Sequence, residues 1–552
     1  MQMKKILAAA LLAAGCLHLH ADEGMWMLNR IDQKTADIMK GLGLTLTPSE
    51  LYNPDGVSLK DAVVDFGDFC SGVVVSPNGL VFTNHHCGFG AIQALSTPED
   101  DILANGFVAK NMEEERPAEG LFVRFLQSTE ECTSRIMTAL DSIYRANPTI
   151  PAREINNTKT DSICNAVERE YSRANPGMDC MVRSYYGGNA FYVSKYKTYR
   201  DVRLVFTATQ TLGKFGGDTD NWMWPRHTGD FSIFRVYANE QNRPADYSPE
   251  NKPYRAEKHL KVNIKGVKEG DFAMVMGFPG STDRYMTSYE IDYMLSTDNP
   301  QRISVRGARQ EILAKDMAAS DKVRIQYASK YASSSNYWKN SIGMSQAITK
   351  LNVKGQKEAQ EASFQAWANQ NTLPDEGYMD ALPKIKEFVE KSASARKNLQ
   401  YMQESMMRAI ELLSLGSVLN DREGVKKEVD VERTMAYANR IYKDFNEPTD
   451  RRVAKRMLKM ARENMTILPS FYAEIIDKDF GGDVDKYVDY LYDNTVVASP
   501  EKLEAFLKNY DVEKAAADPV IPFLKSVMTL SSELRKEAAA YNNLYAEGHR
   551  KY

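Results

Sequence analysis

The spacing of apolar residues changes near Tyr285, and this change restricts the chain to a fold with two kinds of domain. Before this point, short runs of β-branched and aromatic residues are bounded by glycine and proline, which is the pattern of β-strands. After it, apolar residues recur every three to four positions among many glutamates and lysines, as in amphipathic helices. A chain of 552 residues is also too long for one hydrophobic core. We therefore expect a mixed β and α fold, with a β domain over residues 22–285 and an all-α domain over residues 286–552.

The clearest strand signal is a hairpin. Val73–Val75 and Leu80–Phe82 flank the sequence Ser-Pro-Asn-Gly, whose Asn78-Gly79 pair tolerates the positive φ angles of a tight turn. Further strands are predicted at Val202–Thr207, Phe231–Tyr237 and Phe272–Met276. We interpret these strands as parts of an antiparallel β-barrel.

Two helix faces and one helix start are recognisable in the second half of the chain. The residues that share a face are Met402, Met406, Ile410 and Leu413 in one segment, and Val484, Tyr487, Val488 and Leu491 in another. Ser499 followed by Pro500 predicts a helix that begins with a serine cap and a first-turn proline.

The N-terminus has the order of a secretory signal. Lys4 and Lys5 precede an apolar run from Ile6 to Leu17, and Ala21 ends the segment, so residues 1–21 are predicted to be a signal peptide. That run is shorter than the roughly 20 apolar residues needed to cross a bilayer, and no later segment reaches this length. We expect a periplasmic or secreted protein without a transmembrane segment. A lipoprotein acylated at Cys16 is the alternative.

The charge distribution excludes one class of partner. The chain has 70 basic and 74 acidic residues, a formal charge of −4, and the basic residues are scattered along the sequence. A protein that follows a phosphate backbone carries its basic residues in a patch or stripe. No nucleic-acid partner is therefore expected.

A cysteine and a His-His-Cys sequence flank the predicted hairpin. Cys70 precedes its first strand, and His85, His86 and Cys87 follow its second. Export to an oxidising compartment permits disulfides, and we expect Cys70 to pair with Cys87, which leaves the pairing of Cys132, Cys164 and Cys180 open. A disulfide here would hold the loop of a histidine base, which serine catalysis requires to be rigid. The alternatives are a structural histidine pair and a metal site, but no metal-ligand spacing is present.

A second cluster of polar and aromatic residues lies between Phe215 and Asp230. Three carboxylates there could orient a histidine, and Asp230 is favoured because it immediately precedes a predicted strand; Asp218 and Asp220 could simply cap turns. Asn221 and Trp222 could bind the amine and side chain of a substrate, although packing alone also explains the tryptophan.

These segments resemble the bacterial dipeptidyl-peptidase 7 and 11 family of serine exopeptidases, which belong to the chymotrypsin clan. The matching sequences are Asp22–Trp26, Leu51–Gly56, Thr83–Cys87, Gly217–Arg235 and Met276–Gly280. The resemblance implies a chymotrypsin-like β-barrel domain and a helical domain that caps the active-site cleft. It also implies that dipeptides are released from free N-termini of oligopeptides, by a homodimer without a cofactor.

The resemblance assigns roles to five residues. It implies His86 as the general base and Asp230 as the carboxylate that orients it. It implies Asn221, Trp222 and Asn336 as ligands of the substrate's N-terminal amine. It assigns no metal.

The nucleophile motif of the family does not occur in this sequence. Family members carry a Gly-Asn-Ser-Gly-Ser type motif in a C-terminal segment that holds the second barrel, whereas only Ser71 and Ser281 lie next to a glycine in a comparable setting. We expect a serine dipeptidyl-peptidase whose second barrel is incomplete or missing here and whose chain, as given, is inactive. The alternative is a catalytically inactive periplasmic peptide-binding protein. The preference for acidic or hydrophobic residues at the second substrate position stays undetermined.

Overall fold

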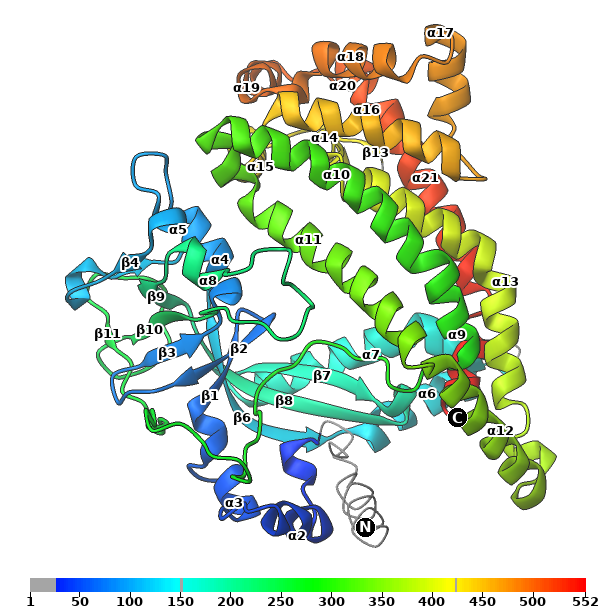
Figure 1. Ribbon diagram of the computed structural model, residues 1–552. Helices are drawn as coiled ribbons and strands as arrows, with labels where there is room; N and C mark the ends of the chain where they lie inside the picture. The colour runs from blue at the N-terminus through cyan, green and yellow to red at the C-terminus, as the bar shows by residue number, and fades with distance from the viewer. Residues whose placement is uncertain (1–25, 149–151, 422–423) are drawn as a thin grey trace, which may run out of the picture.

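The computed structural model describes residues 26–148, 152–421 and 424–552 and divides into a strand-rich and a helical part (Figure 1). The predicted signal peptide and Cys16 lie outside the described residues. In the rainbow colours of Figure 1, the strand-rich part runs from blue to green and the helical part from green to red.

One antiparallel sheet of eleven strands forms the first part, in the order β4-β9-β10-β3-β2-β1-β6-β8-β7, with β5 paired to β9 and β11 paired to β10. The strands are β1 (Val63–Phe66), β2 (Cys70–Val74), β3 (Leu80–Thr83), β4 (Phe107–Val108), β5 (Arg116–Pro117), β6 (Val123–Glu131), β7 (Asp179–Tyr185), β8 (Ala190–Tyr199), β9 (Asp201–Thr207), β10 (Ser232–Ala238) and β11 (Lys252–Pro253). The short pair β12 (Asn420–Asp421) and β13 (Gly424–Val425) lies in the helical part.

The mixed β and α fold class is confirmed, but the sheet is open across the described residues. β4 and β7 stand at opposite ends of the strand order. The long strands β6 and β8 pair from Val123↔Tyr199 to Glu131↔Tyr192 and carry β7 outward, away from the short strands β1–β3. The sheet therefore extends beyond the expected barrel instead of closing upon itself.

Three strand predictions are confirmed. β2 and β3 form the hairpin, with Val73 opposite Phe82, and Gly79 supplies a φ of 67° in its turn. β9 and β10 match the other two predicted strands within one residue at each end.

The strand predicted at Phe272–Met276 is wrong. This segment has no strand partner in the described structure, and Val275 is fully exposed. Its neighbourhood is held by isolated contacts instead, since Leu260 N donates to Val74 O at 2.8 Å and Phe278 N to Ser71 Oγ at 2.6 Å. Strand propensity alone does not form a strand without a neighbouring edge to pair with.

Helices cover and extend the sheet. They are α2 (Gln33–Gly41), α3 (Pro48–Leu51), α4 (His85–Ala94), α5 (Ile102–Asn105), α6 (Thr133–Ala146), α7 (Ala152–Ala174) and α8 (Gln210–Gly213), with 3₁₀ turns at Leu28–Arg30, Leu59–Ala62, Met112–Glu114 and Tyr186–Gly188. The sequence reasoning placed no helices at α6 and α7. These two helices share a small core with β7 and β8 that contains Ile136, Leu140 and Val193.

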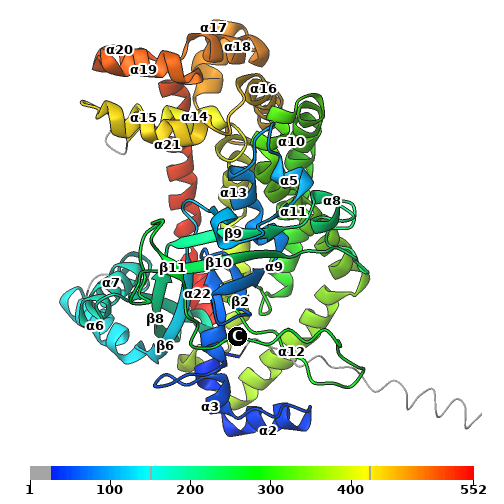
Figure 2. The same ribbon diagram turned by 90° about the vertical axis from the view of Figure 1, so that its left-hand side faces the viewer.

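The second part is helical and has the largest hydrophobic core. Its helices are α9 (Ser288–Tyr293), α10 (Asn299–Ala319), α11 (Asp321–Lys350), α12 (Val353–Asn371), α13 (Ala381–Met402), α14 (Glu411–Gly416), α15 (Val431–Tyr442), α16 (Glu447–Asn464), α17 (Lys478–Phe480), α18 (Val484–Asn494), α19 (Pro500–Lys508), α20 (Val512–Ala517), α21 (Val520–Ala539) and α22 (Asn542–His549). π-helical segments lie at η5 (Met294–Asp298), η7 (Gln403–Met407) and η8 (Tyr472–Asp477), and 3₁₀ turns at Pro374–Glu376 and Val496–Ala498. Figure 2 shows α21 running the length of this part, from α20 to the level of the sheet.

The helix predictions are confirmed with one difference. The four predicted core residues of α18 are buried, and Ser499 accepts a hydrogen bond from Lys502 N at the start of α19. Met402, Met406, Ile410 and Leu413 are all buried in one core, but α13 ends at Met402 and α14 begins only at Glu411. A π-helical segment intervenes, so these four residues do not share one continuous α-helix.

Helix α11 joins the two parts. Gln93, on α4, accepts a hydrogen bond from Ser329 N at 2.8 Å and donates to Gln326 O at 3.4 Å. Arg324 forms an ion pair with Asp101. Among the described residues, every helix is too short or too polar to cross a membrane.

Candidate active site

The pairing of β3 with β10 brings the histidine and the carboxylate together. Thr83 lies opposite Ser232, so the residues that leave β3 lie beside those that enter β10. His86 follows β3 by three residues, in the first turn of α4, and Asp230 precedes β10 by two. Two segments separated by more than 140 residues in the sequence thus meet at one edge of the sheet.

His86 and Asp230 are joined by two hydrogen bonds. Nδ1 of His86 lies 2.7 Å from Oδ2 of Asp230, and the backbone N–H of His86 donates to Oδ1 at 3.0 Å. The imidazole is 69% exposed and the carboxylate only 21%. With Nδ1 held by the carboxylate, Nε2 is directed outward, and this is the geometry of a general base.

The surroundings keep the Asp230 carboxylate charged. Burial acts to raise its pKa, but the hydrogen bonds from His86 outweigh burial and hold the pKa of Asp230 below its usual value. Asn84 donates from Nδ2 to Oδ2 of Asp230 at 3.2 Å, and Ser232 Oγ donates to Asn84 O at 3.0 Å. Sequence reasoning did not identify Asn84, although its place at the helix start was a usable signal.

His85 is turned the opposite way from its neighbour. It is only 1% exposed, packs edge-on against Phe89 at 5.7 Å and lies directly over Gly213. Burial lowers the pKa of His85, which favours the neutral ring. Consecutive residues on a helix point about 100° apart, so one histidine is in the core while the other faces Asp230.

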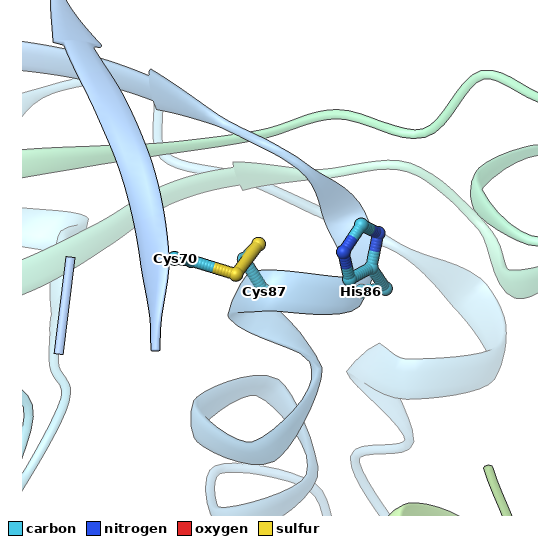
Figure 3. Close-up of side chains that lie close together, drawn as sticks. All are labelled: Cys70, His86 and Cys87. Atoms are coloured by element: carbon cyan, nitrogen blue, oxygen red, sulfur yellow. A yellow bond between two sulfur atoms is a disulfide. The ribbon is translucent and has the colours of Figure 1, made fainter. Parts of the chain in front are cut away.

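A disulfide anchors the turn that carries His86. Cys70, at the start of β2, is bonded to Cys87, and their Cα atoms are 6.1 Å apart. Figure 3 shows the His86 ring beside this bond, and ring nitrogen and sulfur atoms lie within 4.8 Å of one another. The disulfide consumes both thiolates, so this group cannot act as a thiolate metal site.

The loop before Asp230 reaches across to helix α11. Asn221 Nδ2 donates to Oδ1 of Asn336 at 3.0 Å, and Trp222 Nε1 donates to the same oxygen at 2.9 Å. Trp222 adopts a φ of 60° and remains half exposed. The structure therefore brings together the three residues to which the resemblance assigned amine binding. Arg226, which sequence reasoning did not identify, donates to Oδ1 of Asn221 at 3.3 Å.

The other candidates in these segments have local partners. Asp218 forms an ion pair with Lys214 at 3.1 Å, and Asp220 lies against the backbone of Gly216. Ser71 Oγ accepts a hydrogen bond from Phe278 N. These contacts occupy the three side chains within their own turns and leave Asp230 as the carboxylate bonded to a histidine.

An outward-facing imidazole held by a half-buried carboxylate defines a site that can activate a nucleophile for hydrolysis. The comparisons agree with that class. The peptidase S46 family matches residues 21–552. Dipeptidyl-peptidase 7 of Phocaeicola vulgatus is 41% identical over 98% of this chain and 76% of its own length. The Asp/Glu-specific dipeptidyl-peptidase of Porphyromonas gingivalis is 37% identical over 100% and 77%, respectively.

A solved structure agrees as well. The crystal structure of Porphyromonas endodontalis DPP11 in complex with the dipeptide Arg-Glu superposes with a TM-score of 0.87 at 34% identity, over 96% of this chain and 76% of that one. The chain belongs to the peptidase S46 family, and the resemblance to dipeptidyl-peptidases 7 and 11 is confirmed.

Proposed function

We propose that this chain carries the base and orienting carboxylate of a serine dipeptidyl-peptidase that releases dipeptides from the free N-termini of oligopeptides. The observation that supports this most strongly is the 2.7 Å contact between Nδ1 of His86 and Oδ2 of Asp230, which leaves Nε2 exposed. In the proposed reaction, Nε2 takes the proton of a serine hydroxyl as that oxygen attacks the second peptide bond, and water later releases the dipeptide.

The cluster around Asn336 supplies the reason for dipeptide length. A charged amine needs hydrogen-bond acceptors, and the amide oxygens of Asn221 and Asn336 lie together on the loop and on α11. The Trp222 ring closes one side of this group. An ammonium fixed here sets how far the chain extends before the bond that is cut. The curated relatives named dipeptidyl-peptidases support the same length.

The proposal takes the nucleophilic serine from outside the 552 residues. Ser71, the serine close to this site, is hydrogen-bonded to Phe278 N, and no Gly-Asn-Ser-Gly-Ser type motif occurs in the sequence. A version of the protein that includes such a motif should hydrolyse dipeptidyl fluorogenic substrates, whereas the 552-residue chain should not. Hydrolysis by the 552-residue chain would show that another nucleophile exists. Peptide binding without hydrolysis by both would favour the peptide-binding alternative.

Two carboxylates in one loop give a matched test of the base. In the active form, Asp230→Asn should lower kcat by about 10⁴-fold, because the imidazole loses its orienting anion. Asp218→Asn, which breaks only the ion pair with Lys214, should leave kcat within about a factor of 3, the usual scale of an exposed pair. Equal effects of the two substitutions would refute the assignment of Asp230.

Asn336 and Asn340 form a second matched pair, both on α11. Asn336→Ala should raise KM for substrates with a free amine about 10- to 100-fold, the scale of a hydrogen bond to a charged group. Asn340→Ala should have little effect. An equal loss with N-terminally blocked peptides would contradict amine recognition at this site.

Export and dimerisation complete the proposal. The Lys-rich start, the apolar run and Ala21 support cleavage of a signal peptide and a periplasmic or secreted location. Mass spectrometry of the protein recovered from cell fractions would show whether the mature chain begins at Asp22. The homodimer implied by the family stays a prediction for sedimentation analysis.

A further inference from the structure

A cavity of about 810 Å³ lies inside the helical part, between α10, α11, α15 and the segment from η7 to α14. In Figure 1 these elements surround the upper half of α11, on the side away from the sheet. The cavity volume is in the range of small-molecule sites. His86, Asp230 and Asn221 do not line it, so it is separate from the candidate active site.

The lining of the cavity is unusually basic. The six basic residues are Arg302, Arg306, Arg309, Lys330, Arg408 and Arg440, and the acidic ones are Glu404, Glu411 and Asp444. Like charges this close repel one another strongly inside a protein, where the effective dielectric constant is low. A surplus of three positive charges therefore needs compensation.

The acidic residues do not supply that compensation. Glu404 is shared, since it binds Arg306 at 2.7 Å and Arg408 at 3.1 Å. Glu411 binds Lys330 at 2.5 Å. Burial raises the pKa of Asp444 and so weakens its negative charge.

Three arginines remain without a carboxylate partner. Within the described part of the chain, no ion pair or hydrogen bond to a carboxylate is found for Arg302, Arg309 or Arg440. Burial lowers the pKa of Arg309, although Glu411 and Asp450 lie near enough to oppose this effect. Guanidinium groups bind carboxylate and phosphate groups in planar, bidentate geometry.

Two buried polar atoms of the lining residues also lack partners. The Ser334 hydroxyl belongs to a residue that is 3% exposed, and neither this hydroxyl nor Nε of Arg309 has a hydrogen-bond partner among the described residues. An unpaired buried polar group costs about 1–3 kcal/mol, so native proteins rarely keep one without a use. Both residues line the same cavity as the unpaired guanidinium groups.

We propose that this cavity is a binding site for a compact anion that carries at least two negative charges on phosphate or carboxylate groups. Arg302, Arg309 and Arg440 bind its oxyanions, and the Ser334 hydroxyl donates to one of them. Tyr337 and Tyr437 are about half exposed and line the cavity, and the Arg306 guanidinium lies 5.0 Å from the centre of the Tyr337 ring. A ligand bound here contacts α11, the helix that also carries Asn336.

Calorimetric titration of the 552-residue chain with pyrophosphate and with citrate, at constant ionic strength, tests the proposal without any need for peptidase activity. Saturable 1:1 binding of either anion is expected, and the tighter one identifies phosphate or carboxylate as the preferred group. Arg309→Gln should weaken binding at least 10-fold. If thermal unfolding shows that this variant does not fold, Arg302→Gln replaces it with the same expectation.

Two arginines of α15 provide the matched control. Arg440 lines the cavity and Arg433 does not, and both are exposed. Arg440→Gln should weaken binding several-fold, and Arg433→Gln should leave it unchanged. Equal weakening by both substitutions would show that only the general surface charge attracts anions. That result, or no saturable binding of either anion, would overturn the proposal.

Discussion

The disulfide between Cys70 and Cys87 should determine how firmly the His86 turn is held. It joins the start of β2 to the first turn of α4, and the two cysteines are 17 positions apart in the sequence. The loop that it closes contains the whole β2–β3 hairpin. Replacing both cysteines by serine removes the cross-link and leaves no unpaired thiol behind.

The expected effect follows from the length of that loop. In the chain-entropy treatment, closing a loop of 17 residues in the unfolded state costs about 3 kcal/mol at 25 °C, and this is the stability that the double variant loses. At 1.36 kcal/mol for each factor of ten, local opening becomes about 10²-fold more frequent. The loss should be confined to the hairpin and α4, because the helical part has its own core.

Hydrogen exchange followed by mass spectrometry measures this opening directly. Peptides that cover β2, β3 and α4 should exchange about 10²-fold faster in the Cys70→Ser/Cys87→Ser variant, and peptides from α16 and α18 should not change. Cys164→Ser is the control, since this cysteine of α7 is not in a disulfide. If the double variant exchanged as slowly as the control, the disulfide would not be what holds the His86 turn.

Further predictions concern single residues. Gly213→Ala would place a Cβ atom 2.6 Å from the His85 ring and should cost about 1–3 kcal/mol of stability in urea unfolding, whereas Gly90→Ala, with open space around it, should not destabilise; equal midpoints would contradict the crowding. Because burial lowers the pKa of His85, the stability that this neutral ring contributes is complete above about pH 6.5 and is lost as the pH falls through its lower folded-state pKa. His85→Leu should therefore reduce the loss of stability between pH 7.5 and 5, and an unchanged loss would assign it to other groups. Ser499→Ala should lower stability by about 1 kcal/mol by removing the cap of α19, and no shift in the unfolding midpoint would show that the cap is dispensable.

Local sequence patterns were sufficient where neighbouring residues decide the structure. The hairpin at Gly79 follows from a turn sequence between two apolar runs, and the start of α19 follows from a serine before a proline. The segment from Phe272 to Met276 has a similar composition but is not a strand, because no edge in the described structure pairs with it. Helices α6 and α7 were missed because they interrupt a region whose other signals are those of strands.

The sequence by itself determined the two-part architecture, the hairpin and the His-Cys pair that follows it, because each depends on residues within about ten positions of one another. Only the tertiary structure decided that His86 faces Asp230 while His85 is buried, and that Asn221 and Trp222 meet Asn336 on α11. The register of β3 against β10 and the seat of α11 against α4 produce these contacts. Both depend on packing between segments far apart in the chain, which local propensity does not specify.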